Sequence, residues 1–283
     1  MFETILISAN DEFNNNNNIV QKDYNINKFH TYHKKSNGIS CAITGEAPYH
    51  GALILVASGA MKTGCTYLHV FTNSEYAHSL PMIIPEIIAM PFSLSEFERN
   101  IITYRNILIG PGTNSITRKY VEIAYKNLAN LDSLILDAGA LNYLKKNNQN
   151  TEKLIITPHP GEAAKILNIK VSEVQVDRYN AAKMLFDMFN CIVILKGSGT
   201  IIYNGKNFYT CMDGNYKMAI AGMGDMLSGI LLSEMAQNEN NLDACVKSIT
   251  FHSYASDYLY SHATCKHFMP SDIPDTYNEL LNK

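Results

Sequence analysis

The sequence lacks the features that would place the protein at a nucleic acid, at a membrane or outside the cell. No long run of lysine and arginine occurs in its 283 residues, whose formal net charge is −3, and binding a phosphate backbone needs a dense basic patch. No apolar run approaches the length of a membrane span, and the amino-terminal stretch MFETILISANDEF is acidic where a signal peptide is basic. We therefore expect a cytoplasmic protein whose partners are small molecules, with no nucleic acid and no membrane among them.

The six cysteines also lack the spacing of a metal or redox motif. None forms a CxxC pair, and most lie inside apolar runs. This pattern indicates reduced cysteines in the protein core and argues against a disulfide framework or a zinc site. The positions are Cys41, Cys65, Cys191, Cys211, Cys245 and Cys265.

An asparagine-rich segment near the amino terminus shows no helix or strand periodicity. Five consecutive asparagines occupy residues 14–18, and the polar stretch QKDYNINKFHTYHKKSNG lies close behind them. We predict that residues 1–36 form a loosely ordered tail and that residues 37–283 form a single domain. The apolar fraction of 46% is sufficient for a buried core, and we find no internal repeat.

The rest of the chain alternates between β-rich and helical runs, which predicts a mostly parallel sheet covered by helices on both faces. The β-rich runs span residues 40–45, 67–73, 106–112, 133–139, 154–162 and 191–197, and the helical runs span 48–62, 116–128 and 174–190. Residues 86–98 are compatible with a helix or a loop. Residues 200–212 contain two β-rich runs around Asn204-Gly205, a pair that favours a tight hairpin. Helices after Asp225 and over residues 242–262 complete the α/β domain.

The stretch GNYKMAIAGMGDMLSGILLSEM, residues 214–235, combines small residues with one aspartate and a helical apolar pattern. The pattern predicts a helix that begins near Gly224, which puts Asp225 at its amino terminus. Unpaired N–H groups and the helix dipole make such a terminus a cradle for phosphate, and Ala221, Gly222 and Gly224 leave room for the anion. The alternative is that Asp225 only caps the helix after a glycine turn.

Three further strand ends carry glycine-rich or polar tails, namely IGPGTN (109–114), LDAGALN (136–142) and ITPHPGE (156–162). Ligands collect at the carboxyl ends of parallel strands, so we expect these tails to converge. Gly110-Pro111-Gly112 either is a simple turn or brings backbone amides to a ligand. His159, held between two prolines, is a ligand contact or a structural loop residue. Glu162 is a helix-start residue or organises magnesium-bound water.

The segment LKGSGT, residues 195–200, places Lys196 at a strand end before two glycines and two hydroxyl residues. It lacks the GxxxxGK[ST] spacing, so a P-loop is not the source of phosphate binding. A glycine-lined anion cradle beside one aspartate is what phosphoryl transfer to a hydroxyl requires. The aspartate accepts the proton while N–H groups and Mg²⁺ stabilise the transferring charge.

Taken in chain order, GPG, D-A-x-A-L-N, TPHPGE, LKGSGT and GMGD-x-L-S-G resemble the motifs of the ADP/ATP-dependent NAD(P)H-hydrate dehydratases, a branch of the ribokinase-like superfamily. The resemblance extends from about His33 to Pro274 and includes HKKSNG, GEAPYHGA and the late SDIP. It implies a ribokinase-like three-layer α/β/α fold with a mostly parallel central sheet and a small β-hairpin. It also implies cofactor repair, in which a nucleotide phosphorylates the hydroxyl of hydrated NAD(P)H and phosphate is then eliminated to restore NAD(P)H.

The same resemblance implies roles for individual residues. Asp225 would be the catalytic base and would contact the substrate, Glu162 is a candidate contact for magnesium-bound water, and no direct metal ligand is assigned. The substrate-binding residues would be Ala52, Gly112 and His159, and the nucleotide-binding residues would be Lys196, Gly197, Ser198, Gly199, Thr200, Gly222 and Gly224. Mg²⁺ and either ADP or ATP would be required. The resemblance further implies a homotetramer, and we expect any partner epimerase to be a separate chain, since the tail is too short to contain one.

The chain departs from the family pattern at several positions. The second acidic position of D-A-D-A-L-N is Gly139, and the segment that usually reads N-P-G-M-A-T-G-G-M-G-D contains Tyr216, Lys217, Ile220 and Ala221. Asn114 replaces a glycine after GPG, and Glu46 replaces a small residue in the first-strand turn, where its charge would repel phosphate. These departures keep open a binding protein or pseudoenzyme that retains nucleotide affinity. A second rival is a kinase for a small alcohol, because other ribokinase-like enzymes share the same base and anion cradle.

Overall fold

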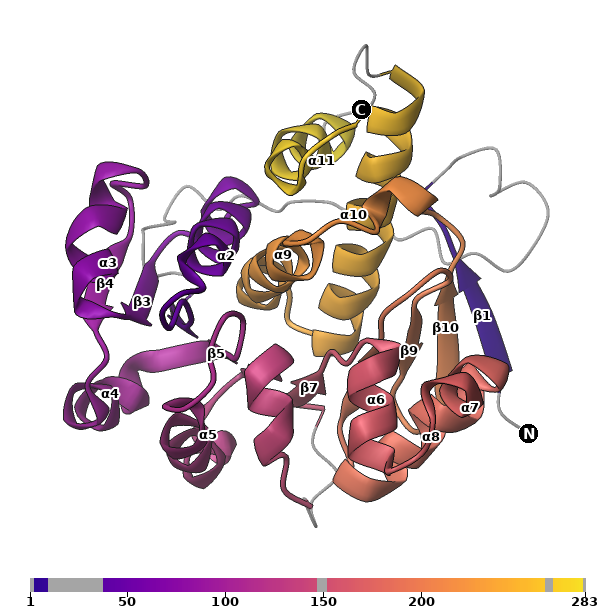
Figure 1. Ribbon diagram of the computed structural model, residues 1–283, viewed down its shortest axis with the longest axis horizontal. Coiled ribbons are helices and arrows are strands. Elements are labelled where there is room, and N and C mark those ends of the chain that lie inside the picture. The colour runs from indigo at the N-terminus through magenta and orange to yellow at the C-terminus, as the bar shows by residue number, and fades with distance from the viewer. Residues whose placement is uncertain (1–2, 10–37, 147–151, 263–266, 282–283) are drawn as a thin grey trace.

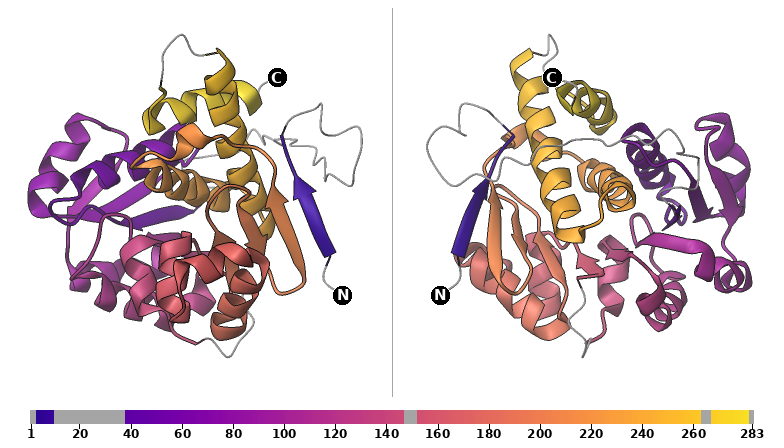
Figure 2. Two further views of the ribbon diagram at one scale, coloured as in Figure 1. Left: turned by 45° about the vertical axis from the view of Figure 1, so that its right-hand side comes forward. Right: turned by 180° about the vertical axis from the view of Figure 1, so that it is seen from behind.

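The computed structural model describes residues 3–9, 38–146, 152–262 and 267–281. Its centre is a sheet of ten strands with helices packed on both faces (Figure 1 and Figure 2). The strands are β1 (Glu3–Ile7), β2 (Ile39–Ile43), β3 (Leu68–Thr72), β4 (Ile88–Pro91), β5 (Tyr104–Ile109), β6 (Ser133–Leu136), β7 (Leu154–Ile156), β8 (Ile192–Leu195), β9 (Ile201–Tyr203) and β10 (Asn207–Cys211).

The sheet is almost entirely parallel, in the strand order β1-β10-β9-β8-β7-β6-β5-β2-β3-β4. Among the described strands, β9 alone runs antiparallel to its neighbours, β8 and β10. The turn between β9 and β10 contains Asn204, whose side-chain oxygen accepts the N–H groups of Lys206 and Asn207 at 3.0 Å, and Gly205, whose φ is 86°. The predicted parallel sheet and hairpin are both confirmed.

Side chains that alternate along the buried strands build two cores, one on each face of the sheet. On β5, Ile107 and Ile109 belong to one core, whereas Leu108 belongs to the other. The first core is covered by α4 (Leu94–Asn100), α5 (Thr117–Lys126), α6 (Pro160–Leu167), α7 (Val171–Val176) and α8 (Arg178–Phe189). The opposite layer contains α2 (His50–Lys62), α3 (Ser74–Ser79), α9 (Met223–Gln237), α10 (Asn241–His262) and α11 (Ile273–Leu281). This arrangement confirms the three-layer α/β/α prediction.

The amino-terminal segment contains more structure than its sequence predicts. Residues 3–7, assigned by pattern to a loosely ordered tail, form β1, which pairs in parallel with β10 from Glu3 opposite Asn207 to Ile7 opposite Cys211. Five residues are too few to show a strand period, and β1 owes its order to pairing with a sheet edge far along the chain. Residues 10–36 of that predicted tail lie outside the described residues, and the single domain over 37–283 stays a prediction.

Three other segments differ from the pattern-based expectation. Within 86–98, where a helix or loop is expected, β4 precedes α4. The expected helix over 174–190 is two helices, because Asp177 leaves the helical backbone with φ −139° and its side chain accepts the Asn180 N–H to cap α8. The sequence pattern also does not predict α11.

The five described cysteines are buried and free, as expected, and Cys265 lies outside the described residues. None of the described helices is both long and apolar enough to cross a membrane.

Close approach of two backbones fixes the position of α9. A methyl group on Gly229 would lie 2.3 Å from the Val56 carbonyl oxygen of α2, and one on Gly59 would lie 2.8 Å from the Met226 carbonyl oxygen. Only glycine at both positions lets the helices pack this tightly. The start of α9, which carries Asp225, is therefore set by contact with α2.

A buried carboxylate joins the far end of α9 to the last two helices. Glu234 is fully buried, and its Oε2 accepts from the Lys247 ammonium of α10 at 2.9 Å and from Asn238 at 2.9 Å. The Tyr277 hydroxyl of α11 donates to Glu234 Oε1 at 2.5 Å. These contacts satisfy a charge that would otherwise be costly to bury.

Lys247→Met is expected to lower the free energy of unfolding by about 3–5 kcal/mol, because it leaves the buried Glu234 carboxylate without its counter-charge. Urea denaturation provides the measurement. The matched control is Lys62→Met, whose ion pair with Asp275 at 3.0 Å is solvent-exposed and should contribute less than about 1 kcal/mol. Equal losses for the two variants would contradict the structural role of Lys247.

Candidate functional site

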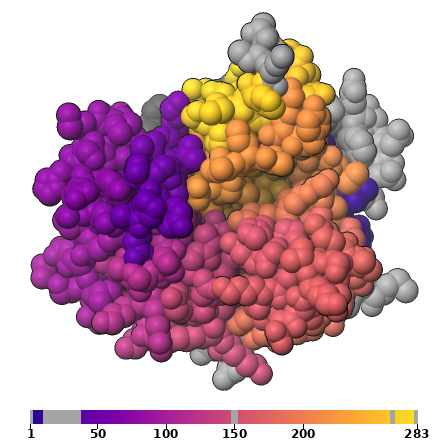
Figure 3. Space-filling view, in the orientation of Figure 1, coloured from indigo at the N-terminus to yellow at the C-terminus, as the bar shows by residue number. Residues whose placement is uncertain are grey.

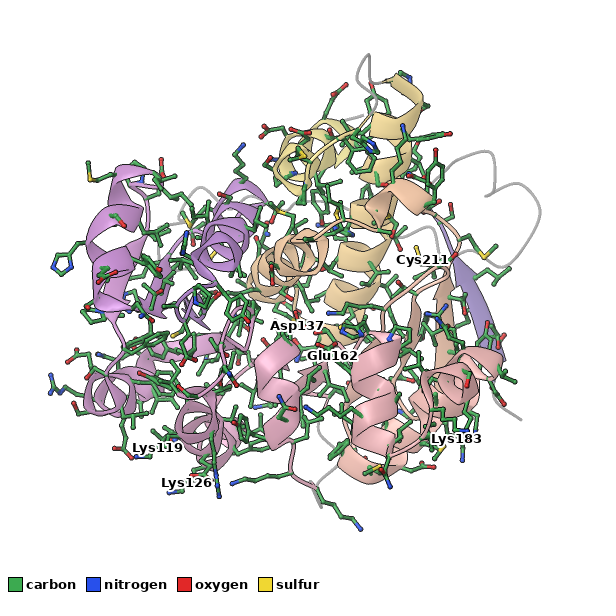
Figure 4. All side chains as sticks on the ribbon, viewed as in Figure 1. Lys119, Lys126, Asp137, Glu162, Lys183 and Cys211 are labelled. Carbon is green, nitrogen blue, oxygen red and sulfur yellow. The ribbon has the colours of Figure 1, made fainter. Side chains whose placement is uncertain are left out.

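The tails of β5, β6, β7 and β8 meet at one edge of the sheet, as the sequence predicts. The Gly139 N–H donates to the Gly110 carbonyl at 3.3 Å, and the Lys196 N–H donates to the Pro158 carbonyl at 2.9 Å. Figure 4 shows Asp137, which follows β6, and Glu162, on α6, next to each other between α6 and α9. These tails therefore build one site together with the start of α9.

A buried ion pair lies at the centre of the site. The Lys196 ammonium is 2.7 Å from Asp137 Oδ1, and the Ser228 hydroxyl of α9 donates to Asp137 Oδ2 at 2.7 Å. Burial by itself would raise the pKa of Asp137, but the Lys196 charge and the hydrogen bonds hold it below its usual value. Asp137 thus ties β6 to β8 and α9. The motif LDAGALN contains this residue, yet only its partners in the fold reveal its importance.

Asp225 lies in the first turn of α9, near this ion pair. Its pKa is raised to about 6, by burial first and then by the Asp137 carboxylate, against the opposing effect of Lys196. The N-cap of α9 is Gly222, with φ 89°, and none of the described side chains caps the helix. This argues against the alternative that Asp225 only caps the helix. A carboxylate that titrates near 6 is suited to accept a proton at neutral pH.

His159 and Glu162 hold each other at the start of α6. Two backbone N–H groups, those of Gly161 and Glu162, donate to His159 Nδ1 at 3.0 and 3.2 Å, and the His159 N–H donates to Glu162 Oε2 at 2.8 Å. Because Nδ1 accepts, the proton of the neutral ring resides on Nε2, which lies 3.5 Å from Glu162 Oε1. Both residues therefore serve the helix start, and the half-exposed His159 ring still presents an N–H donor.

A cavity of about 600 Å³ opens between α6, α9 and α10 beside this cluster. Figure 3 shows the surface hollowed where the pink region near α6 faces the orange region around residues 215–225. The size is typical of a small-molecule site. Of the predicted site residues, the cavity is lined by His159, Lys196, Gly197, Ser198, Gly199, Thr200 and Gly224.

The cavity loop from Gly197 to Thr200 is held by a residue that sequence reasoning misses. Arg178 of α8 donates through Nη2 to the carbonyls of Leu195 at 3.0 Å and Lys196 at 3.2 Å, and through Nη1 to the Ser198 carbonyl. Arg178 belongs to a different element from the loop, so no local motif connects the two. The guanidinium fixes the loop from the side of α8.

The remaining predicted residues lie outside the cavity. A methyl group on Gly112 would be 2.8 Å from the Ala52 Cβ, so the two predicted substrate residues touch on a neighbouring wall. Gly222 faces Leu55 of α2, where a methyl group would lie 2.4 Å from Cδ1. None of these three is among the described residues that line the cavity, and neither is Asp225 nor Glu162.

Glu46 uses its carboxylate within the chain. Its Oε2 accepts the N–H of Asn114 at 2.6 Å and that of Ser115 at 3.0 Å, and the Ser115 hydroxyl donates to Oε1. The charge therefore occupies amides that could otherwise hold an external anion, and it clamps the GPG loop to the first-strand turn. The sequence alone predicts that the charge of Glu46 repels phosphate, and it does not reveal that the backbone N–H groups of Asn114 and Ser115 bind this carboxylate.

The other departures from the family pattern also have identifiable surroundings. At Gly139 a Cβ atom would lie 2.0 Å from the Thr113 carbonyl oxygen, so this backbone leaves no room for a side chain. Ile220 lines the cavity, whereas Ala221 is exposed and is not among the described residues that line it.

The oxygen atoms of the site fit a magnesium ion that arrives with a nucleotide. Among the described residues, no group of three or more His, Cys, Asp or Glu side chains is arranged to hold a metal. Both Asp137 oxygens are engaged by Lys196 and Ser228. Glu162 Oε2 accepts the His159 N–H, so the more weakly engaged oxygen of this pair of carboxylates is Glu162 Oε1, 3.5 Å from His159 Nε2. Mg²⁺ commonly binds through one or two carboxylates, waters and substrate phosphates.

Asp225→Asn is expected to raise the free energy of unfolding at pH 7. Aspartate in the unfolded chain has a pKa of about 3.9, so the fold loses stability as the pH rises from there through the folded pKa of about 6. Urea denaturation should show a gain for the variant at pH 7 that shrinks toward zero at pH 4. The same gain at both pH values would contradict the raised pKa.

Glu46→Ala is expected to lower the free energy of unfolding by about 1–2 kcal/mol, because two amides lose a charged acceptor. Hydrogen exchange should accelerate at the Asn114 and Ser115 amides. Glu98→Ala, at an exposed position of α4, is the control and should change stability by less than about 0.5 kcal/mol. Unchanged exchange at both amides would show that the clamp is absent in solution.

Comparison of the sequence with known proteins points to one family. A family profile described as NAD(P)H-hydrate dehydratase matches residues 40–278. The chain is 33% identical over 255 residues to the bifunctional NAD(P)H-hydrate repair enzyme Nnr of Vibrio cholerae, covering 88% of this chain and 51% of that protein. It is 30% identical over 242 residues to the ADP-dependent (S)-NAD(P)H-hydrate dehydratase of Neisseria meningitidis, covering 82% of this chain and 80% of that protein. The chain thus spans about half the length of the bifunctional relative.

Solved structures agree with this assignment. The ADP/ATP-dependent NAD(P)H-hydrate dehydratase of Bacillus subtilis, co-crystallised with ATP and Mg²⁺, matches with a TM-score of 0.80 at 26% identity, over 90% of this chain and 92% of that one. A ribokinase-like superfamily protein of Enterococcus faecalis, at 21% identity and a TM-score of 0.77 over 90% of each chain, shows the fold alone. The ribokinase-like fold is confirmed. Since the profile covers most of its length, the chain belongs to the NAD(P)H-hydrate dehydratase family.

Proposed function

We propose that the protein converts hydrated NAD(P)H back to NAD(P)H in a reaction that consumes ADP or ATP. The observation that carries this proposal is the Asp225 carboxylate, poised with a pKa of about 6 beside Lys196 at the start of α9. Membership of the family supports the substrate class. The names of the relatives from N. meningitidis and B. subtilis support the use of an adenine nucleotide.

Asp225 would act in the first of two steps. It accepts the proton of the hydroxyl that hydration placed on the nicotinamide ring, while the hydroxyl oxygen attacks the terminal phosphorus of the nucleotide. The bond from that phosphorus to the bridging oxygen breaks, and the nucleotide leaves one phosphoryl group shorter. In the second step the ring carbon–oxygen bond breaks, phosphate departs and the ring loses a proton, which restores the double bond.

Lys196 and the start of α9 would stabilise the transferring charge. Burial opposes a charge on Lys196, but Asp137 and Glu162 raise its pKa above the usual value, so the ammonium stays protonated. A methyl group on Gly224 would lie 3.5 Å from Lys196 Nζ, so the ammonium adjoins the helix terminus. A fixed cation and helix N–H groups together form a preorganised electrostatic site.

The cavity and the wall beside it would separate the two ligands. The residues from Lys196 to Thr200 and Gly224 line the cavity and would hold the nucleotide. His159, through its Nε2–H, and the touching pair Ala52 and Gly112 would hold the hydrated dinucleotide. Gly222 would act indirectly, by setting the start of α9. Mg²⁺, when bound to the nucleotide phosphates and near Glu162, would neutralise part of their charge.

The rival functions have weaker support. A kinase for a small alcohol shares the fold, since ribokinases of Arabidopsis thaliana and Giardia lamblia match with TM-scores of 0.57 and 0.56, but at 11% identity each they support the fold alone. A pseudoenzyme is disfavoured because Asp225, Lys196 and Gly224 remain adjacent. We further propose a cytoplasmic homotetramer, and the mass of the assembly in solution would test the tetramer.

Mixing the protein with hydrated NADH, Mg²⁺ and either ADP or ATP is expected to restore the absorbance band of reduced nicotinamide. Asp225→Asn should reduce turnover by about 10²–10⁴-fold, because a positioned proton acceptor typically contributes that much. Wild-type kcat/KM should rise with pH through about 6, since the base must be deprotonated.

Three results would overturn the proposal in different ways. Turnover of Asp225→Asn within a few-fold of wild type would remove Asp225 as the base. A stable phosphorylated product without recovery of absorbance would favour the kinase. Nucleotide binding by folded protein without any turnover would favour the pseudoenzyme.

A further inference from the structure

One wall of the cavity is built differently from the pattern usual in the family. The wall includes Asp213, Gly214, Asn215, Tyr216, Met218 and Ala219. At the position where the family usually has proline, Tyr216 places a large ring that is 74% exposed and lines the cavity. The next residue, Lys217, stands where glycine is usual.

The Tyr216 ring packs against a second aromatic ring. Its edge meets the ring of Tyr260 on α10, with centroids 5.9 Å apart and planes at 73°. The Lys217 ammonium lies 4.5 Å from the centroid of the same Tyr260 ring. Tyr260 therefore supports Tyr216 from the side and is itself covered by a cation.

The backbone under Tyr216 is also fixed to α10. The Gly214 N–H and the Asn215 side-chain amide donate to the two oxygens of Asp257 at 2.7 and 2.8 Å. The Asn215 oxygen accepts the Lys217 N–H at 3.0 Å, which caps the short turn that begins at Tyr216. An aromatic ring on such a base loses little conformational freedom when a ligand packs on it.

Charge differs between the two ends of the cavity. Lys196 and the start of α9 lie at one end, where anions are favoured. Asp213, which accepts from Ser8 at 2.6 Å and from the Ala9 N–H at 2.7 Å, also lines the cavity and lies close to Asp257. Figure 4 shows Asp137, the partner of Lys196, well apart from Cys211, which precedes Asp213 in the chain. Phosphates would therefore sit at Lys196, and the base would point toward Tyr216.

The wall between these ends suits a flat aromatic ring. Met218, Ile220 and Ile249 contribute apolar side chains to the lining, and they carry no charge that a neutral base would have to desolvate. Tyr216 lines the same cavity, and its exposed ring is open to a base that binds there.

We propose that Tyr216 is a specificity-determining residue that stacks on the base of the bound adenine nucleotide, with Tyr260 and Lys217 holding its ring in position. The inference rests on the proposed function and deepens it by naming the contact that reads the base. The contact departs from the family pattern, because the usual proline offers no aromatic ring.

Calorimetric titration of ADP with Mg²⁺, and separately of inorganic pyrophosphate, into wild type, Tyr216→Ala, Tyr216→Leu and Tyr216→Phe tests the contact. Tyr216→Ala and Tyr216→Leu should bind ADP about 5- to 150-fold more weakly, which corresponds to the about 1–3 kcal/mol typical of a base stacked on an aromatic side chain. Tyr216→Phe should bind ADP as wild type does. Pyrophosphate has no base, so its affinity should not change in any variant.

Ile102→Ala, at an exposed position far from the cavity lining, is the surface control and should leave ADP affinity unchanged. Thermal unfolding of each variant checks the fold, and the 74% exposure of Tyr216 means that truncation opens no buried space. Wild-type affinity for ADP in Tyr216→Ala, or equal losses for ADP and pyrophosphate, would overturn the stacking assignment. Wild-type protein that binds no adenine nucleotide would instead overturn the proposed function.

Discussion

The ion pair between Lys196 and Asp137 is the interaction on which the rest of the site depends. Its two charges come from the ends of β8 and β6, and Ser228 brings α9 to the same carboxylate. A buried charge is tolerated only when it is paired and hydrogen-bonded. The ends of β6 and β8 and the start of α9 must therefore stay close enough to keep these contacts. This requirement, together with the close contact between α2 and α9 and the Arg178 hydrogen bonds, sets the geometry of the loop after β8 and of the start of α9.

The same charges set the chemistry of Asp225. Burial and the neighbouring carboxylates of Asp137 and Glu162 disfavour its ionised form, and Lys196 compensates only in part. The pKa of the Asp225 carboxylate is therefore raised to about 6, and the ionised form lowers the stability of the fold. Sites that perform proton transfer often carry such a cost, because the environment that tunes a base also destabilises its charge.

Much of this could be read from the sequence where the signal is local. The central strands β5 to β8 are short β-rich runs, and the motifs at their ends predict the convergence of the tails because parallel strands end at one edge. The edge strands β1 and β4 carry no comparable pattern. They form because they pair with the neighbouring strands β10 and β3, and their own strand propensity does not predict them. Arg178, Asp137 and the clamp of Glu46 were hidden for the same reason: each acts on a partner distant in the sequence, which only the fold brings near.

The departures from the family pattern leave the cluster of Lys196, Asp137 and Asp225 intact. Three of these residues have a specific contact within the chain. Glu46 accepts a backbone N–H, the backbone at Gly139 packs against the Thr113 carbonyl, and the Tyr216 ring contacts the ring of Tyr260. These changes remove neither the Asp225 carboxylate nor the Lys196 ammonium. A protein that only bound nucleotide would be more stable with a neutral residue at Asp225, because no binding contact requires a desolvated carboxylate beside phosphates. The presence of that unfavourable charge, next to an ammonium and a helix terminus, is the physical argument for catalysis over simple binding.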